Sequence, residues 1–121
     1  MRLLIKHFLI AVFLVLVLTF IGASCSKSTS SSNSALVATS EVTIKDMSFS
    51  PQNISVSSGT VVTWKNEDTT EHQVISDGDL PDLMSGILEP NDTFSFTFDK
   101  SGTFNYHCNI HPSMKGQVSV K

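Results

Sequence analysis

The 121-residue sequence is poor in basic residues. It holds 8 Lys and Arg against 11 Asp and Glu, which gives a formal net charge of −3 at pH 7 with His neutral. Two of the basic residues, Arg2 and Lys6, stand at the extreme N-terminus, so the rest of the chain is more acidic still. Nucleic-acid binding depends on basic side chains that contact phosphates. We therefore expect no nucleic-acid partner and no attraction to anionic membrane surfaces.

Long apolar runs are also lacking, because none reaches the roughly 20 residues that a membrane-spanning helix needs. The longest run, residues 8–21, is interrupted only by Thr19, follows a basic start and precedes the small residues 22–24. A basic start, an apolar centre and a small-residue end are typical of a secretory signal peptide. We predict a signal peptide over residues 1–24 and an exported mature chain. An uncleaved membrane anchor is disfavoured because the run is short.

Cysteine is scarce, with only Cys25 and Cys108. Disulfides persist outside the cytoplasm, so a bridge between the two is one interpretation. It is disfavoured, because Cys25 lies beside the cleavage point and a bridge there would only tie a tail to the core. Residues 21–25 resemble a bacterial lipoprotein signal, and this resemblance implies that Cys25 is lipidated and becomes the first mature residue. We expect a location in the cell envelope, on the periplasmic or extracytoplasmic face, with the lipid at Cys25 as the only membrane contact.

Large side chains are nearly absent from residues 25–40, where Leu36 and Val37 form the only large apolar pair. Such a Ser-rich segment has too little to bury to offset the entropy of ordering. We predict a flexible linker there.

From residue 41 onward, short runs alternate between apolar and polar residues, and no stretch has a helical period. Alternation with period two predicts strands. Turn-forming residues separate the runs, as at Ser57-Ser58-Gly59, Asp77-Gly78 and Ser101-Gly102. We predict an all-β domain over residues 41–121, a β-sandwich of seven to eight short strands in two packed antiparallel sheets. The stripe of Phe94, Phe96 and Phe98 is expected in its core.

Histidine and sulfur ligands are few, and three of them stand close together. Cys108, His111 and Met114 follow one another at three-residue intervals. This mixture of soft sulfur and imidazole suits copper better than magnesium, calcium or manganese. His72 is the best candidate for a fourth ligand because it opens an apolar, strand-like run. The set predicts a mononuclear copper site with a trigonal His2Cys plane and a long axial Met.

The other candidate ligands are disfavoured. Alternation along residues 104–108 places Cys108 on the inner face and His107 on the outer face. Met47 fits the pattern of the first strand and is expected to be core filler. Met84 belongs to the turn-rich segment 80–84, which we expect to be exposed rather than packed under a loop. Met114 is preferred as the axial ligand because two residues separate it from His111.

The stretch from Gly102 to Val118 (GTFNYHCNIHPSMKGQV) resembles the ligand loop of the cupredoxins, the small blue copper proteins, and is similar to their amicyanin and plastocyanin branches. Further matches are VVTWKN over residues 61–66 and FSP over residues 49–51, so the resemblance spans nearly all of residues 41–121. It implies a Greek-key sandwich in which His72, Cys108 and His111 form the strong plane and Met114 is the weak axial ligand. Gln73 departs from the pattern, where relatives commonly have Asn. The resemblance implies a hydrogen bond from the backbone N–H of this residue to the Cys sulfur. Because Gln replaces Asn, it is open whether the side chain at this position also braces the site.

A thiolate and two imidazoles bind both copper oxidation states, and a preformed site keeps reorganisation small. We therefore expect a monomeric electron shuttle between protein redox partners. His111 is the expected electron-exchange edge, and Pro112 with Leu83 and Met84 the expected apolar docking patch.

The acidic residues near 67–71 and 77–82 are interpreted as solvated turns. A second interpretation is that they steer a basic partner. A copper carrier or store without redox cycling is the alternative function. An enzyme is disfavoured, because His107 alone is left as a further ligand and Met is a poor zinc ligand.

Overall fold

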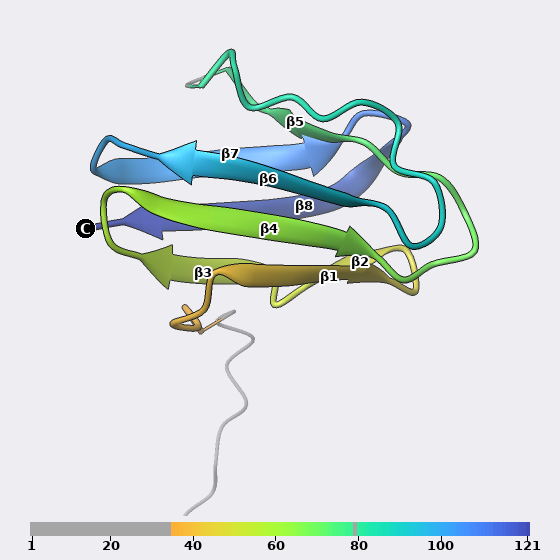
Figure 1. The fold of residues 1–121 in the computed structure, drawn as a ribbon, viewed down its shortest axis with the longest axis horizontal. Coiled ribbons are helices and arrows are strands. Elements are labelled where there is room, and N and C mark those ends of the chain that lie inside the picture. The colour runs from red at the N-terminus through yellow and green to blue at the C-terminus, as the bar shows by residue number, and fades with distance from the viewer. Residues whose placement is uncertain (1–34, 79) are drawn as a thin grey trace, which may run out of the picture. The chain divides into compact units, whose positions relative to one another are not determined.

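The computed structural model describes residues 35–78 and 80–121, which form eight strands (Figure 1). The strands are β1 Glu41–Lys45, β2 Ser48–Ser50, β3 Asn53–Val56, β4 Thr60–Asn66, β5 Val74–Ser76, β6 Thr93–Phe98, β7 Gly102–Cys108 and β8 His111–Val120. No helix in this part of the chain could cross a membrane. The predicted signal peptide, Cys25 and most of the predicted linker lie outside the described residues.

The strands form two four-stranded sheets, with the orders β2-β1-β4-β6 and β3-β8-β7-β5. The prediction of a β-sandwich is confirmed, but the expectation of purely antiparallel sheets is wrong. β1 pairs parallel with β4, and β3 pairs parallel with β8. The antiparallel hairpins β1–β2 and β7–β8 join strands that are neighbours in sequence. The two parallel pairs join strands that are distant in sequence, so no local turn signal marks them.

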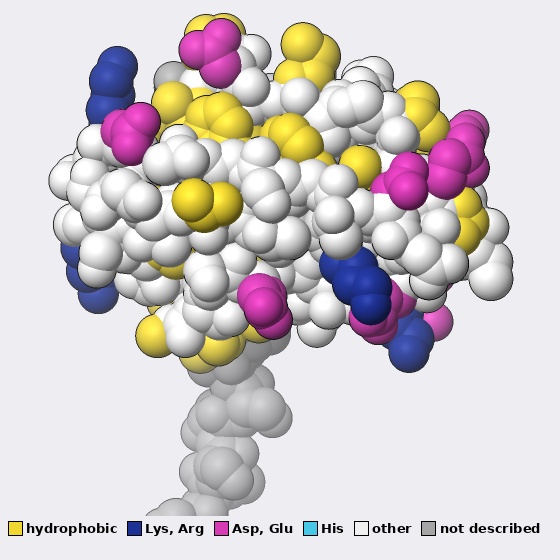
Figure 2. Space-filling view, in the orientation of Figure 1, with side chains coloured by type: hydrophobic (Ala, Val, Ile, Leu, Met, Phe, Trp, Pro, Cys, Tyr) yellow, Lys and Arg dark blue, Asp and Glu magenta, His cyan; other side chains and the backbone are white. Residues whose placement is uncertain are grey.

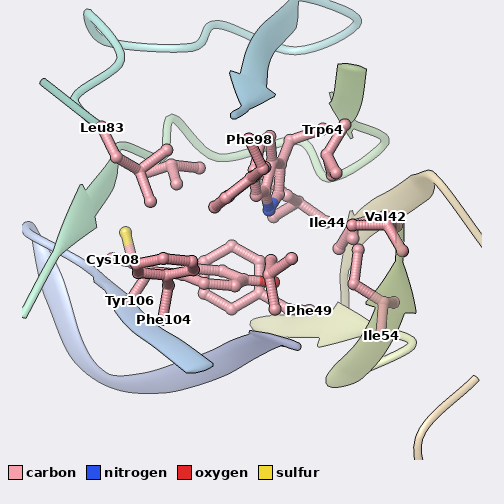
Figure 3. Packing of buried hydrophobic residues seen from close by; sticks show 14 of the residues in the cluster. Val42, Ile44, Phe49, Ile54, Trp64, Leu83, Phe98, Phe104, Tyr106 and Cys108 are labelled. Atoms are coloured by element: carbon pink, nitrogen blue, oxygen red, sulfur yellow. The ribbon is translucent and has the colours of Figure 1, made fainter. Parts of the chain in front are cut away.

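The core lies between the facing sides of the two sheets. Figure 3 shows Phe104, Tyr106 and Cys108 side by side, facing Trp64 and Phe98 of the other sheet. Trp64 and Tyr106 meet edge to face, with ring centroids 5.4 Å apart. Among the residues that the structure describes, those of the buried core all lie between Val42 and Val120.

The Phe stripe of β6 is only partly core, as Phe98 is buried while Phe94 and Phe96 are half-buried. β6 is an edge strand of its sheet, so its side chains are covered from one flank only.

Val37 extends the pairing beyond the eight strands. It forms an isolated parallel bridge with Ile54 of β3. Its N–H donates to the Asn53 carbonyl at 3.1 Å, and its carbonyl accepts from the Ser55 N–H at 2.9 Å. Val37, which belongs to the segment predicted as linker, is therefore attached to the edge of β3.

The turn between β1 and β2 places Met47 outside the core. Asp46 and Met47 have φ angles of 50° and 57°, as in the two-residue turn that joins tightly paired strands. The Met47 side chain is 45% exposed. The expectation that it fills the core is wrong, because the strand pattern was extended across a turn that carries no Gly or Asn signal.

Candidate metal centre

Three of the predicted ligands lie on the hairpin of β7 and β8. Cys108 ends β7, His111 begins β8, and the two residues pair with each other. The next pair is His107 with Lys115, so residues 112–114 form a bulge on β8. Met114 lies in this bulge and is 3% exposed. The hairpin therefore brings a thiol, an imidazole and a thioether to one end of the sandwich.

His72 reaches the same end from the segment before β5. Its N–H and carbonyl exchange hydrogen bonds with Leu88, at 3.1 and 2.8 Å. Two residues later, Val74 pairs with Cys108 across the sheet. The backbone thus holds His72 beside the end of β7, and its side chain is fully buried.

The three ligand atoms form a nearly equilateral triangle. Cys108 Sγ lies 3.7 Å from His72 Nδ1 and 3.6 Å from His111 Nδ1, and the two nitrogens are 3.3 Å apart. A point equidistant from atoms with these separations lies about 2.0 Å from each, which is about the length of a metal–imidazole bond. Two imidazoles, a thiolate and a nearby thioether are the donors of a mononuclear copper site. The residues present therefore fit one copper ion.

Asp68 holds His72 through the ring nitrogen that faces away from the other ligands. Its carboxylate accepts the His72 Nε2 at 3.0 Å and the backbone N–H groups of Asp46 and Met47, each at 3.0 Å. The Met47 N–H bond, followed by those from His72 and Asp46, holds the pKa of Asp68 below its usual value against the opposing effect of burial. With Nε2 bonded to Asp68, His72 turns Nδ1 toward the other ligands.

The interpretation of Asp68 as a solvated turn residue is wrong. A signal was present in the sequence, because a carboxylate four residues before a candidate ligand histidine can fold back onto it.

Gln73 joins the two sides of the site. Its backbone N–H lies 3.4 Å from Cys108 Sγ, as the cupredoxin resemblance implied. Its side chain accepts from Asn109 Nδ2 at 2.9 Å and donates to the Ser85 carbonyl at 3.0 Å. The brace that the Asn-to-Gln departure put in question is present, and it links the ligand hairpin to the segment that follows β5.

His107 lies apart from the three ligand atoms, as predicted from alternation. Its side chain is 26% exposed and its Nδ1 contacts the Asp77 carboxylate. Cys108, by contrast, is a buried free thiol. Among the described residues, His72, Cys108 and His111 form the one group of His, Cys, Asp or Glu with metal-binding geometry.

The chain and its fold have counterparts among known proteins. The family model of the cupredoxin-like domain matches residues 11–120, so the chain belongs to the cupredoxin-like family. Among curated proteins it is similar to amicyanin-alpha of Methylorubrum extorquens, with 36% identity over 84 residues that cover 67% of this chain and 71% of the relative. An oxidised amicyanin variant superposes with a TM-score of 0.64 and 33% identity, covering 67% of this chain and 80% of that chain. A copper-containing nitrite reductase of Thermus scotoductus gives a TM-score of 0.63 and 29% identity, over 67% of this chain and 22% of that chain.

Proposed function

We propose that the chain is an exported type 1 copper protein that carries single electrons between protein redox partners. The observation that carries this proposal is the buried triangle of Cys108 Sγ, His72 Nδ1 and His111 Nδ1, with sides of 3.3 to 3.7 Å. Two buried ligands and the hydrogen bonds of Asp68 and Gln73 fix this triangle before a metal arrives. Preformed geometry keeps reorganisation small when one electron is gained or lost.

Each ligand has a distinct part in this proposal. His72, Cys108 and His111 would hold the copper ion, and Met114 would be its fourth ligand. Copper supplies the one-electron couple. Cys108 gives the thiolate path into β7, and the partly exposed His111 is the edge at which electrons enter and leave.

The docking surface of a partner is proposed around His111. Ile110 and Pro112 flank His111 in sequence and are both exposed, Ile110 by 37%. Met84, 55% exposed, and Ile87, 46% exposed, belong to the segment bonded to His72 and Gln73. Leu83, which was expected in this patch, is fully buried and instead packs in the core.

The charge of this protein's surface predicts a second property of the partner. Exposed acidic residues of the segments between β4 and β6 include Glu67, Glu71, Glu89 and Asp92, besides Asp77 and Asp82. Figure 2 shows acidic side chains at the right-hand end of the visible face, where β4 ends and β6 begins in Figure 1. A partner with a basic rim around an apolar contact fits this surface, and its association rate should fall as salt is raised.

A visible spectrum separates electron transfer from the alternative, a copper carrier without redox cycling. The oxidised copper-loaded protein should show an intense blue absorption from the Cys108 thiolate, and Cys108→Ser should remove it. A colourless copper-loaded protein would favour the carrier. A blue Cys108→Ser protein would overturn the proposed centre.

An enzymatic role is disfavoured on the described residues. Beyond the two ligand histidines they contain only His107, which is already bonded to Asp77. A second metal centre would need further ligands, and none gather elsewhere in residues 35–78 and 80–121.

We also propose that Cys25 carries a lipid anchor. Native protein should then sediment with membranes, whereas Cys25→Ser should block processing or release a soluble domain that still binds copper. Recovery of the native protein wholly in the soluble fraction would contradict the anchor.

A further inference from the structure

Met47 is a methionine in an unusual place. Its side chain is 45% exposed, and its backbone lies in the left-handed region, which large side chains rarely adopt. Its N–H is bonded to Asp68, whose carboxylate also holds His72 Nε2. The residue is therefore fixed at the surface by the same group that orients a ligand of the metal centre.

A cavity connects this exposed methionine with the buried one. It has a volume of about 140 Å³ and is lined by Met47, Phe49 and Gln52 on one side of the chain and by Ser113, Met114 and Lys115 of β8 on the other. Met114 is 3% exposed, so nearly all of its surface is inside the protein. An exposed and a buried methionine are thus both among the residues that line one cavity.

Thioether sulfur selects Cu(I) over hard cations. Lys115 also lines the cavity, so electrostatic attraction does not favour a cation there and the affinity must come from the sulfur atoms. We propose that Met47 and Met114 form a transient acquisition site for Cu(I), through which the ion passes from the surface to the His72–Cys108–His111 centre. This inference rests on the proposed function as a copper protein.

The passage is a sequence of ligand exchanges. Cu(I) leaves its carrier for the Met47 sulfur, is shared with Met114, and then gains the two imidazoles and the thiolate. The ion keeps its oxidation state throughout. The one proton released is that of the Cys108 thiol, which leaves when the thiolate forms.

Rates of copper loading test this route. Apo-protein is mixed with a Cu(I)–bicinchoninate chelate, and loss of the chelate colour gives the rate of transfer. Met47→Leu keeps the size of the side chain and removes its sulfur, so loading should slow severalfold. The amount of copper bound at the end, and the spectrum after oxidation, should not change.

Met84→Leu is the matched control. Met84 is 55% exposed but does not line the cavity, so Met47→Leu should slow loading more than Met84→Leu does. Equal rates for Met47→Leu and wild type would overturn the proposal, as would slowing by Met84→Leu alone. If the wild type takes up no Cu(I) at all, the proposed function fails rather than this route.

A second measurement locates the ion directly. Ag(I), a redox-inert analogue of Cu(I), is added to protein with labelled methionine methyl groups. In Cys108→Ser protein, whose centre lacks the thiolate, the Met47 methyl resonance should shift at lower Ag(I) than that of Met84. Equal shifts of Met47 and Met84 would mean adventitious binding to any exposed thioether, and would overturn the proposal.

Discussion

At the scale of a single residue, the Asp68 carboxylate joins the β1–β2 turn to a histidine of the metal centre. It accepts three hydrogen bonds, from a turn and from a ligand histidine, and all three favour its charged form. Asp68→Asn keeps the shape of the side chain but replaces one acceptor oxygen by an NH2 donor. At least one of the three hydrogen bonds is then lost, because two donors face each other. We expect a loss of about 1–3 kcal/mol in unfolding free energy and a copper affinity lowered by about 10–100-fold.

Denaturant unfolding and copper titration measure the two effects, and Asp82→Asn, an exposed carboxylate, is the control. The pH dependence gives an independent check. A pKa lowered in the folded state means that the stabilisation is complete above the ordinary value of 3.8 and is lost as pH falls through the lower, folded value. Asp68→Asn should therefore flatten the acid side of the stability profile, and an unchanged acid side would contradict this account.

Tyr106 differs from Asp68 in that its buried polar group has no partner in the described part of the chain. Its hydroxyl and the Trp64 Nε1 are buried among the described residues without a hydrogen-bond partner. Burial raises the pKa of Tyr106. Removing a buried polar group that has no partner stabilises a fold, so Tyr106→Phe should raise the unfolding free energy by about 1 kcal/mol.

The pH dependence of Tyr106 follows from its raised pKa. Above the unfolded value of about 10, the unfolded state ionises first and the wild type loses stability. The Tyr106→Phe protein should lack this part of the loss. Fluorescence of Trp64, the single Trp of the chain, reports unfolding in both proteins. A destabilised Tyr106→Phe would show that the hydroxyl has a partner in solution.

At the scale of the element, the β7–β8 hairpin depends on a residue outside it. Gln73 bonds Asn109 at the tip of the hairpin and Ser85 on the other side. Gln73→Ala should keep the blue colour, because the bond to Cys108 Sγ comes from the backbone N–H. Amide exchange at Asn109 should become faster and electron self-exchange slower, since the hairpin is less restrained.

Gln73→Asn is the informative comparison, because its shorter arm cannot keep both contacts unless the hairpin moves. NMR of the copper(I) form measures amide exchange, and line broadening in mixtures with the oxidised form measures self-exchange. Wild-type values for both quantities in Gln73→Ala would mean that the side-chain brace does not restrain the site.

The elements also show what a sequence pattern can and cannot predict. Alternation placed Tyr106 and Cys108 inward and His107 outward, because side-chain direction in a strand depends only on position. The meeting of His72 with Cys108 and His111 followed from ligand chemistry. The brace of Gln73 and the nest around Asp68 depend on atoms from three segments, and the exposure of Met47 depends on a left-handed turn. Of these, only the contact between Asp68 and His72 leaves a detectable spacing in the sequence, because the two residues stand four apart.

At the scale of the whole molecule, a small domain gains stability from its ion. A ligand that binds only the folded state stabilises it by about 4 kcal/mol when present at a thousand times its dissociation constant. Each kcal/mol shifts the unfolding temperature of a domain this size by about 4–8 °C. We expect copper removal to lower the unfolding temperature by more than 10 °C, roughly as these two relations imply. Calorimetry of loaded and apo-protein measures this, and Cys108→Ser should show a much smaller difference between the two.

The position of β8 governs when the fold can form. β8 is the last strand in sequence, yet it lies inside its sheet, between β3 and β7. While the ribosome is still making this chain, that sheet lacks an interior strand, and two of the three triangle ligands stand within the last fourteen residues. Pairing of β8 with β3 also joins segments that are far apart in sequence, as in the pair of Asn53 with Gln117, which slows folding relative to local contacts. The sheet that carries Cys108 and His111 can therefore close only after β8 has been made, so the copper-binding triangle is assembled late in folding.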